Sequence, residues 1–115
     1  MSPKFVEKPW GYEIWFEVNE NYAVKELFLK QGCSCSLQYH DFKHETFYVV
    51  KGLLKVTQGE NVESLKDSIL KPGDICVLPP KIIHRSFAIQ DTIFIECSTN
   101  HLDDVIRLQD NYGRI

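Results

Sequence analysis

Two histidines, a glutamate and a glutamine are spaced so that they could bind one metal ion. Gln38 and His40 stand two residues apart, Glu45 follows a short polar turn, and His84 comes after a double proline. Imidazole nitrogens with carboxylate and amide oxygens suit a divalent metal such as Zn, Mn, Fe, Co or Ni. The pattern therefore predicts a single metal centre, and the ligand types leave the identity of the metal open.

Strands are the elements that must bring these side chains together. Residues two apart share one face of a strand, so Gln38 and His40 are expected to point the same way. Glu45 opens the next strand pattern, in which the apolar residues Phe47 and Val49 share its face. We therefore expect the polar residues to meet at one end of a hydrophobic interior.

The rest of the chain is also rich in strand patterns. Short runs of β-branched and aromatic residues recur about every ten residues, with turn residues between them. These runs cover residues 11–18, 21–29, 33–40, 45–56, 74–79, 84–89 and 91–98. They show no strand–helix alternation, so the predicted fold class is all-β, a sandwich or a barrel.

The end of the chain has a different periodicity. Asn100 and Asp103 give an N-cap pattern, apolar residues follow at positions 102, 105, 106 and 108, and Gly113 comes after them. This period is typical of a helix, so one short C-terminal helix is predicted.

Length, charge and cysteine content narrow the function classes. The chain has 115 residues, which predicts one domain over residues 1–115. Its net charge is −3 and no run of Lys or Arg is longer than two, which disfavours nucleic-acid binding. No apolar stretch is long enough to span a membrane, and the N-terminus has no apolar signal core. The cysteines lack the C-x-x-C spacing, so we expect buried or inert thiols and a cytoplasmic location; they are Cys33, Cys35, Cys76 and Cys97.

Several of these residues fall into the motifs of a known family. The first cupin motif is resembled by Gly32, Gln38, His40, Glu45 and Gly52, with the glutamine in the first histidine slot. The second cupin motif is resembled at positions 73, 79 and 84. The chain is most similar to the type II mannose-6-phosphate isomerases, which often form the C-terminal part of a bifunctional enzyme with mannose-1-phosphate guanylyltransferase. The segments that carry this resemblance are K-P-W-G at 8–11, S-L-Q-Y-H at 36–40, H-R at 84–85 and D-D-V-I-R-L-Q-D-N-Y-G-R at 103–114.

The resemblance implies a fold, a reaction and roles for individual residues. The fold would be a cupin double-stranded β-helix, a jelly-roll barrel, and the substrate a small sugar phosphate, with mannose 6-phosphate converted to fructose 6-phosphate. The implied metal ligands are Gln38, His40, Glu45 and His84; the catalytic candidates are Lys43 and Arg85; the candidates for binding the sugar phosphate are Lys25, Arg85 and Arg107. A homodimer and a role in polysaccharide biosynthesis are also expected. Arg107 and Arg114 could instead pair with nearby aspartates and fix the chain end.

The predicted ligand set suits an aldose–ketose isomerisation. Four protein ligands on a six-coordinate ion leave two positions for adjacent sugar oxygens. One carboxylate with three neutral ligands leaves a net positive charge, which stabilises an enediolate as its charge develops. Lys43 is the candidate proton carrier, at a position where the family has arginine.

Two other functions stay open. If Gln38 does not bind the metal, the remaining His40, Glu45 and His84 form the two-His-one-carboxylate set of non-haem Fe(II) oxygenases. The chain also departs from the family motifs at positions 43, 81 and 88, so a non-catalytic sugar- or metal-binding cupin is the third interpretation. The other two histidines, at positions 44 and 101, are predicted to be solvated.

Overall fold

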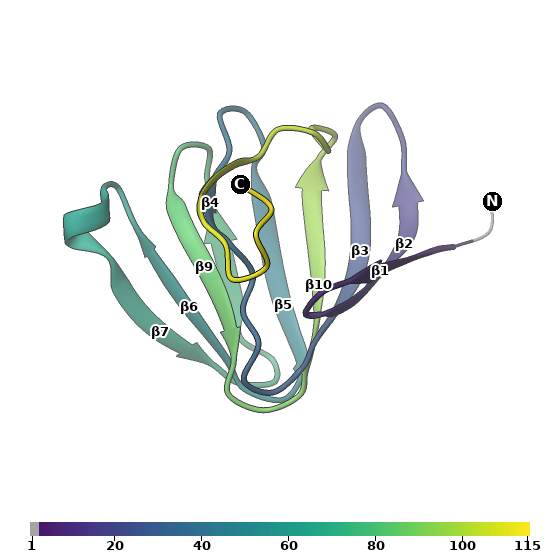
Figure 1. Cartoon of the computed structure of the whole chain (residues 1–115). Coiled ribbons are helices and arrows are strands. Elements are labelled where there is room, and N and C mark those ends of the chain that lie inside the picture. The colour runs from purple at the N-terminus through teal and green to yellow at the C-terminus, as the bar shows by residue number, and fades with distance from the viewer. Residues whose placement is uncertain (1–2) are drawn as a thin grey trace.

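The computed structural model describes residues 3–115, which form two facing antiparallel sheets (Figure 1). The strands of the six-stranded sheet are, in spatial order, β1 (Lys4–Lys8), β2 (Gly11–Val18), β3 (Tyr22–Leu29), β10 (Thr92–Thr99), β5 (Glu45–Lys51) and β8 (Ile75–Leu78). Those of the five-stranded sheet are β11 (Ile106–Gln109), β4 (Leu37–Tyr39), β9 (Ile83–Ala88), β6 (Leu54–Gly59) and β7 (Lys66–Leu70). A short 3-10 helix, η1 (Val62–Ser64), precedes β7.

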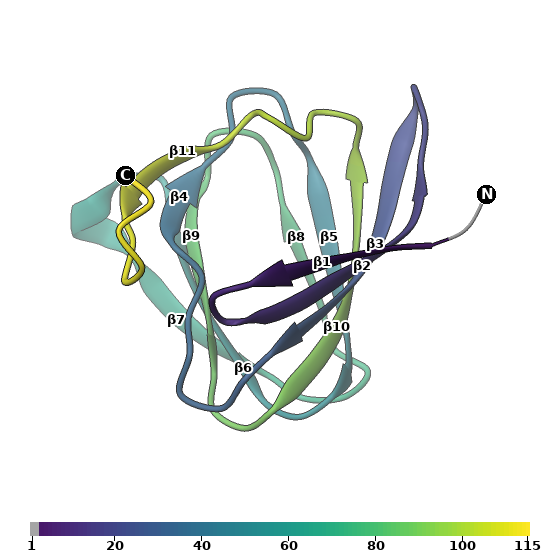
Figure 2. The same ribbon diagram turned by 45° about the vertical axis from the view of Figure 1, so that its right-hand side comes forward.

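The two sheets curve around one interior (Figure 2). The buried side chains are apolar at one end of this interior and polar at the other. On β10, Phe94 is fully buried and packs on Phe47, with ring centroids 4.8 Å apart. Two residues further along, on the same face, the buried side chain is that of Glu96. The inward face of β3 also changes from apolar to charged: Leu27 is buried, and so is Lys25, two residues before it. Polar side chains are thus buried at one end of a hydrophobic interior.

Most of the strands predicted from the sequence are present. The predicted run at residues 45–56 is divided into β5 and β6 at Gly52, whose φ is +95°. A Cβ at this position would lie 2.3 Å from the Asp91 carbonyl oxygen, so only glycine allows this close approach. The strands β1 and β7 were not predicted, because both are short and carry several charged residues.

The predicted C-terminal helix is wrong. Residues 106–109 form β11, in which Ile106 pairs with Tyr39 and Arg107 with Gln38 of β4. The segment before it is held by Asp104, whose carboxylate accepts backbone amides of the loop after His40. These contacts are with residues far away in the sequence, so the local helical pattern does not indicate them, and they outweigh the local preference for a helix.

The outer face of the six-stranded sheet carries exposed apolar side chains near its β8 edge. They are Tyr48, Val50, Ile75 and Val77. This face is an apolar surface on which a second chain could pack, and the homodimer stays a prediction. Within residues 3–115 there is no helix long and apolar enough to cross a membrane.

Candidate metal centre

Three of the four predicted ligands converge at the polar end of the interior. His40, at the end of β4, Glu45, at the start of β5, and His84, on β9, offer ligand atoms that all lie within 4.8 Å of one another. The Glu45 Oε2 atom lies 2.7 Å from His40 Nε2 and 3.8 Å from His84 Nε2. All three residues are buried, with exposed fractions of 5% or less.

The hydrogen bonds of the two imidazoles leave lone pairs that face one another and could bind a cation. The Nδ1 atom of His40 contacts the Asp104 carbonyl oxygen, and Nδ1 of His84 contacts the Ile82 carbonyl oxygen at 3.1 Å. Each Nδ1 must therefore donate, so Nε2 of a neutral ring carries a lone pair. Both Nε2 atoms and Glu45 Oε2 are buried without a hydrogen-bond partner among the described residues. Three lone-pair donors that face one another, each ring oriented by a carbonyl, fit a divalent metal ion.

The electrostatics of the cluster favour a charged Glu45 and a neutral His84. Burial raises the pKa of Glu45, but the contact with His40 and the charges of Lys43 and His84 outweigh it and lower the pKa to about 2. Burial lowers the pKa of His84, and the nearby Glu45 offsets this only in part. An ionised carboxylate with a neutral imidazole is the state in which these groups bind metals.

Asp104 is a residue whose role the sequence did not reveal. Its carboxylate accepts backbone amides from Asp41, Phe42 and Lys43 at 3.0, 2.7 and 2.9 Å, and its carbonyl accepts from His40. Burial alone would raise the pKa of Asp104, but these amide hydrogen bonds lower it to about 2. The C-terminal segment thus fixes the loop that carries two site residues.

Replacing Asp104 by alanine is expected to weaken metal binding up to about tenfold, because the carboxylate that holds the loop after His40 is lost, while the backbone carbonyl that accepts from His40 remains. The affinity would be measured by titrating metal-free protein with Mn²⁺ or Zn²⁺. Asp91→Ala is the matched control, since Asp91 caps the backbone amide of Gln31 at a turn away from the site. A folded Asp104→Ala protein with wild-type affinity would show that the loop after His40 keeps its place without the Asp104 carboxylate.

A second buried charge cluster lies beside the first. Lys43 Nζ is 3.1 Å from Glu96 Oε2 and 3.9 Å from Glu45 Oε2, and all three side chains are at most a tenth exposed. Burial lowers the pKa of Lys43, but the two carboxylates raise it by more, so the side chain is an ammonium. Burial and the charge of Glu45 raise the pKa of Glu96. Sequence reasoning did not select Glu96, although it shares the inward face of β10 with Phe94.

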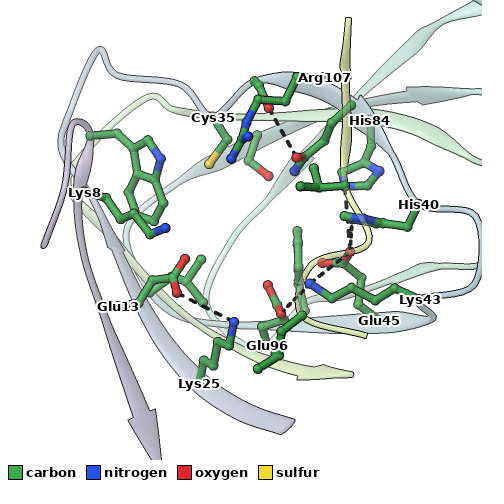
Figure 3. Close-up of a pocket in the computed structure, with 18 of the residues that line it drawn as sticks. Lys8, Glu13, Lys25, Cys35, His40, Lys43, Glu45, His84, Glu96 and Arg107 are labelled. Atoms are coloured by element: carbon green, nitrogen blue, oxygen red, sulfur yellow. Dashed lines mark hydrogen bonds and ion pairs between the residues drawn. The ribbon is translucent and has the colours of Figure 1, made fainter. Parts of the chain in front are cut away.

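Both clusters line one cavity of about 370 Å³, a size typical of small-ligand sites. Figure 3 shows Lys8, Glu13 and Lys25 across this cavity from His40 and His84. Its cationic lining residues are Lys8, Lys25, Lys43, Arg107 and Arg114, and its acidic ones are Glu13, Glu45, Glu96 and Asp103. Cations thus outnumber carboxylates before any metal is counted, so the cavity suits an anionic ligand.

The predicted sugar-phosphate residues differ in their surroundings. Lys25 is buried in the cavity wall, 3.7 Å from Glu13 and over the ring of Trp15. Arg107 points into the cavity from β11, and its buried Nε has no hydrogen-bond partner among the described residues. Arg85 is not brought into the cavity lining: its guanidinium donates to the carbonyls of Cys35 and Gln109 and so ties β9 to the chain end.

The two remaining predicted residues are Gln38, on β4, and Arg114, which follows β11. Gln38 lines the cavity between the strand partners His84 and Arg107, and its Oε1 accepts from the Ser36 hydroxyl at 3.2 Å. Arg114 makes two side-chain hydrogen bonds to Asp110, at 2.8 and 2.9 Å, which confirms the pairing that fixes the chain end.

The cysteines carry no reactive thiolate in this cavity. Cys35 lines it, but burial raises the pKa of its thiol to about 12. Cys76 is buried as expected, and burial raises its pKa too. The expected burial of Cys97 is wrong, because its side chain is exposed on the outer face of β10. All four residues are free thiols.

Comparisons with known proteins match this arrangement. The model of the family described as mannose-6-phosphate isomerase C-terminal matches residues 2–110. The xanthan biosynthesis protein XanB of Xanthomonas campestris is 30% identical in an alignment that covers 95% of this chain and 23% of XanB. Mannose-1-phosphate guanylyltransferase ManC of Salmonella typhimurium is 32% identical over 96% of this chain and 23% of the length of ManC. The chain thus spans about a quarter of the length of these relatives.

Solved structures confirm the cupin fold. Oxalate decarboxylase from Bacillus subtilis superposes with a TM-score of 0.81 at 20% identity, over 93% of this chain and 30% of that one. An RmlC-like cupin from Shewanella frigidimarina gives a TM-score of 0.73 at 19% identity, over 86% of this chain and 85% of that one. At such low identity the likeness concerns the fold alone.

Proposed function

The chain belongs to the mannose-6-phosphate isomerase C-terminal family, and from this premise we propose that it is itself a metal-dependent isomerase of mannose 6-phosphate and fructose 6-phosphate. The observation that carries the proposal is a group of buried polar atoms around one cavity that have no hydrogen-bond partner among the described residues. The residues concerned are His40, Glu45, His84, Glu96 and Arg107. Buried polar groups are rarely left unpaired, so this cavity is built for a polar ligand.

A metal would be held by His40, Glu45 and His84, with the amide oxygen of Gln38 as a fourth ligand once it leaves Ser36. When bound, a dication supplies positive charge for the two adjacent sugar oxygens as negative charge develops on them. The fold and cluster are compatible with several metals; the related fold of Bacillus subtilis oxalate decarboxylase contains Mn(II) centres.

Lys43 would contribute a second positive charge at the reacting end. Its ammonium lies between the carboxylates of Glu96 and Glu45, and both hold it in the charged form. A protonated lysine cannot accept a proton from carbon, so its role in this proposal is to stabilise charge on the substrate oxygens.

The phosphate group would bind beside Arg107 and Lys8. Arg107 has an unpaired buried Nε, and Lys8 lies across from the histidines, so both are available for an anion. Arginine is suited to phosphate because its planar donors match two oxygens. Lys25, which is already paired with Glu13, would bind a sugar hydroxyl or the phosphate edge. Arg85 enters only as a support of the chain end.

The proposal is tested by incubating the metal-loaded chain with mannose 6-phosphate without oxygen. We expect fructose 6-phosphate to form, to stop forming after chelation, and to form again after metal is restored. Absence of product from a protein with confirmed metal content would contradict the proposal.

An oxygenase is the second candidate, because the Oε1 atom of Gln38 is engaged by Ser36 and the cluster then has two histidines and one carboxylate. An oxygenase needs oxygen, so it would form no product in the assay without oxygen. Tight binding of the sugar phosphate without turnover would instead favour the non-catalytic cupin.

A further inference from the structure

Glu96 is a buried carboxylate that neither the metal cluster nor the core explains. It is 6% exposed and lines the cavity from β10, beside Phe47 of β5, the strand that also carries Glu45. Its Oε2 atom forms an ion pair with Lys43 at 3.1 Å but lacks an aligned hydrogen-bond partner among the described residues. Placing a carboxylate in such a site is costly, which indicates a function for it.

The other carboxylates of the cavity are committed elsewhere. Glu45 directs an oxygen at both imidazoles of the metal cluster. Glu13 accepts the Trp15 indole N–H at 2.7 Å and pairs with Lys25. Asp103 is exposed. Among the described residues, Glu96 is the buried lining carboxylate that is neither in the cluster nor hydrogen-bonded, and Figure 3 shows it between Lys25 and Lys43 on the cavity wall.

We propose that Glu96 is the base that carries the proton between C2 and C1 of the open-chain sugar phosphate; this inference rests on the isomerase function proposed above. A carboxylate is an effective base for such a transfer when it is within reach of the carbon-bound proton and shielded from water. The neighbouring ammonium of Lys43 contacts Oε2 and holds the carboxylate in place.

The proton transfer takes place in two stages. Glu96 takes the proton from C2, the C2–H electron pair becomes the C1–C2 double bond, and the carbonyl pair of C1 passes to O1, which takes a proton from water. O2 then returns its hydroxyl proton to water, the C2 carbonyl forms, and the double-bond pair takes the proton from Glu96 at C1. The aldose has become the ketose, and Glu96 is again a carboxylate.

The test compares the wild-type chain with Glu96→Gln, which keeps the shape of the side chain but cannot accept a proton. We expect kcat to fall about 1,000-fold and the deuterium exchange at C2 of mannose 6-phosphate in D₂O to be lost. Metal content, and the calorimetric affinity for the unreactive sorbitol 6-phosphate, are expected to change less than about threefold, because Glu96 is proposed to act on the proton alone.

Two further variants complete the design. Glu26→Gln makes the same change on the opposite face of β3, where Glu26 pairs with Ile95, and should behave as wild type. Glu96→Asp keeps the carboxylate but withdraws it by one methylene, so it should retain part of the exchange and provides a second test if the glutamine variant does not fold.

The outcomes separate the two proposals. Turnover within tenfold of wild type in a folded Glu96→Gln protein would overturn the role of Glu96 and leave the isomerase standing. If the glutamine variant does not fold, undiminished turnover of Glu96→Asp would have the same meaning, because shortening the base should slow the proton transfer. A metal-loaded wild-type chain that neither isomerises mannose 6-phosphate nor exchanges its C2 hydrogen would overturn both.

Discussion

Replacing His40 or His84 by alanine is expected to remove the bound metal and leave the fold intact. Each change deletes one of the converging ligand atoms, and loss of a direct ligand should lower metal affinity by at least about 100-fold, since loss of a mere supporting contact costs 10- to 100-fold. Metal content would be measured by mass spectrometry after dialysis, and the fold by circular dichroism. Isomerase activity is expected to disappear with the metal.

The chain provides its own controls for this experiment. His44 and His101 are exposed and lie outside the cluster, so His44→Ala and His101→Ala should retain wild-type metal content. Without metal, the His40 and His84 variants should be somewhat less stable than the metal-free wild type, because each loses the packing of a buried ring and its Nδ1 hydrogen bond to a backbone carbonyl. Full metal occupancy in either site variant would disprove the ligand assignment.

The cluster could be predicted from the sequence because its geometry is local to strands. Alternation places Gln38 with His40 and Glu45 with Phe47, so the faces of two strands follow from the residues alone. The partner strand of His84 is not local, so its place rested on its position after a double proline and on the match to the second motif. Lys81 also illustrates the value of the motif: it has a φ of +72° at a position where the motif has glycine, the residue that adopts this conformation without strain.

Other parts of the site depend on which residues meet across the fold. The contact of Asp104 with the loop after His40 joins residues more than sixty positions apart, and nothing in the chain-end pattern indicates it. Glu96 did leave a signal, since it alternates with the apolar Phe94 and so shares an inward face. That signal is weak alone, because a glutamate in a strand usually faces solvent. Its burial becomes clear only when both sheets are in place.

Replacing Lys43 by methionine is expected to lower turnover about 100- to 1,000-fold while sparing the metal, because the change removes a positive charge from the reacting end but no ligand atom. Methionine fills similar space. Lys43 also lowers the pKa of Glu96, so its loss should raise that pKa further, and the acid side of the pH–rate profile should move to higher pH. Turnover would be followed by fructose 6-phosphate formation across a pH series, with metal content measured on the same samples.

Arginine at position 43 distinguishes charge from proton transfer. A guanidinium does not give up its proton near neutral pH, yet it restores the positive charge between Glu96 and Glu45. If Lys43 acts through its charge, Lys43→Arg should regain activity to within about tenfold of wild type and return the pH profile to its original position. If the arginine variant is as inactive as the methionine variant, the lysine must itself exchange a proton with the substrate. Unchanged turnover in Lys43→Met would remove the residue from the mechanism, and the ion pair with Glu96 would then be structural.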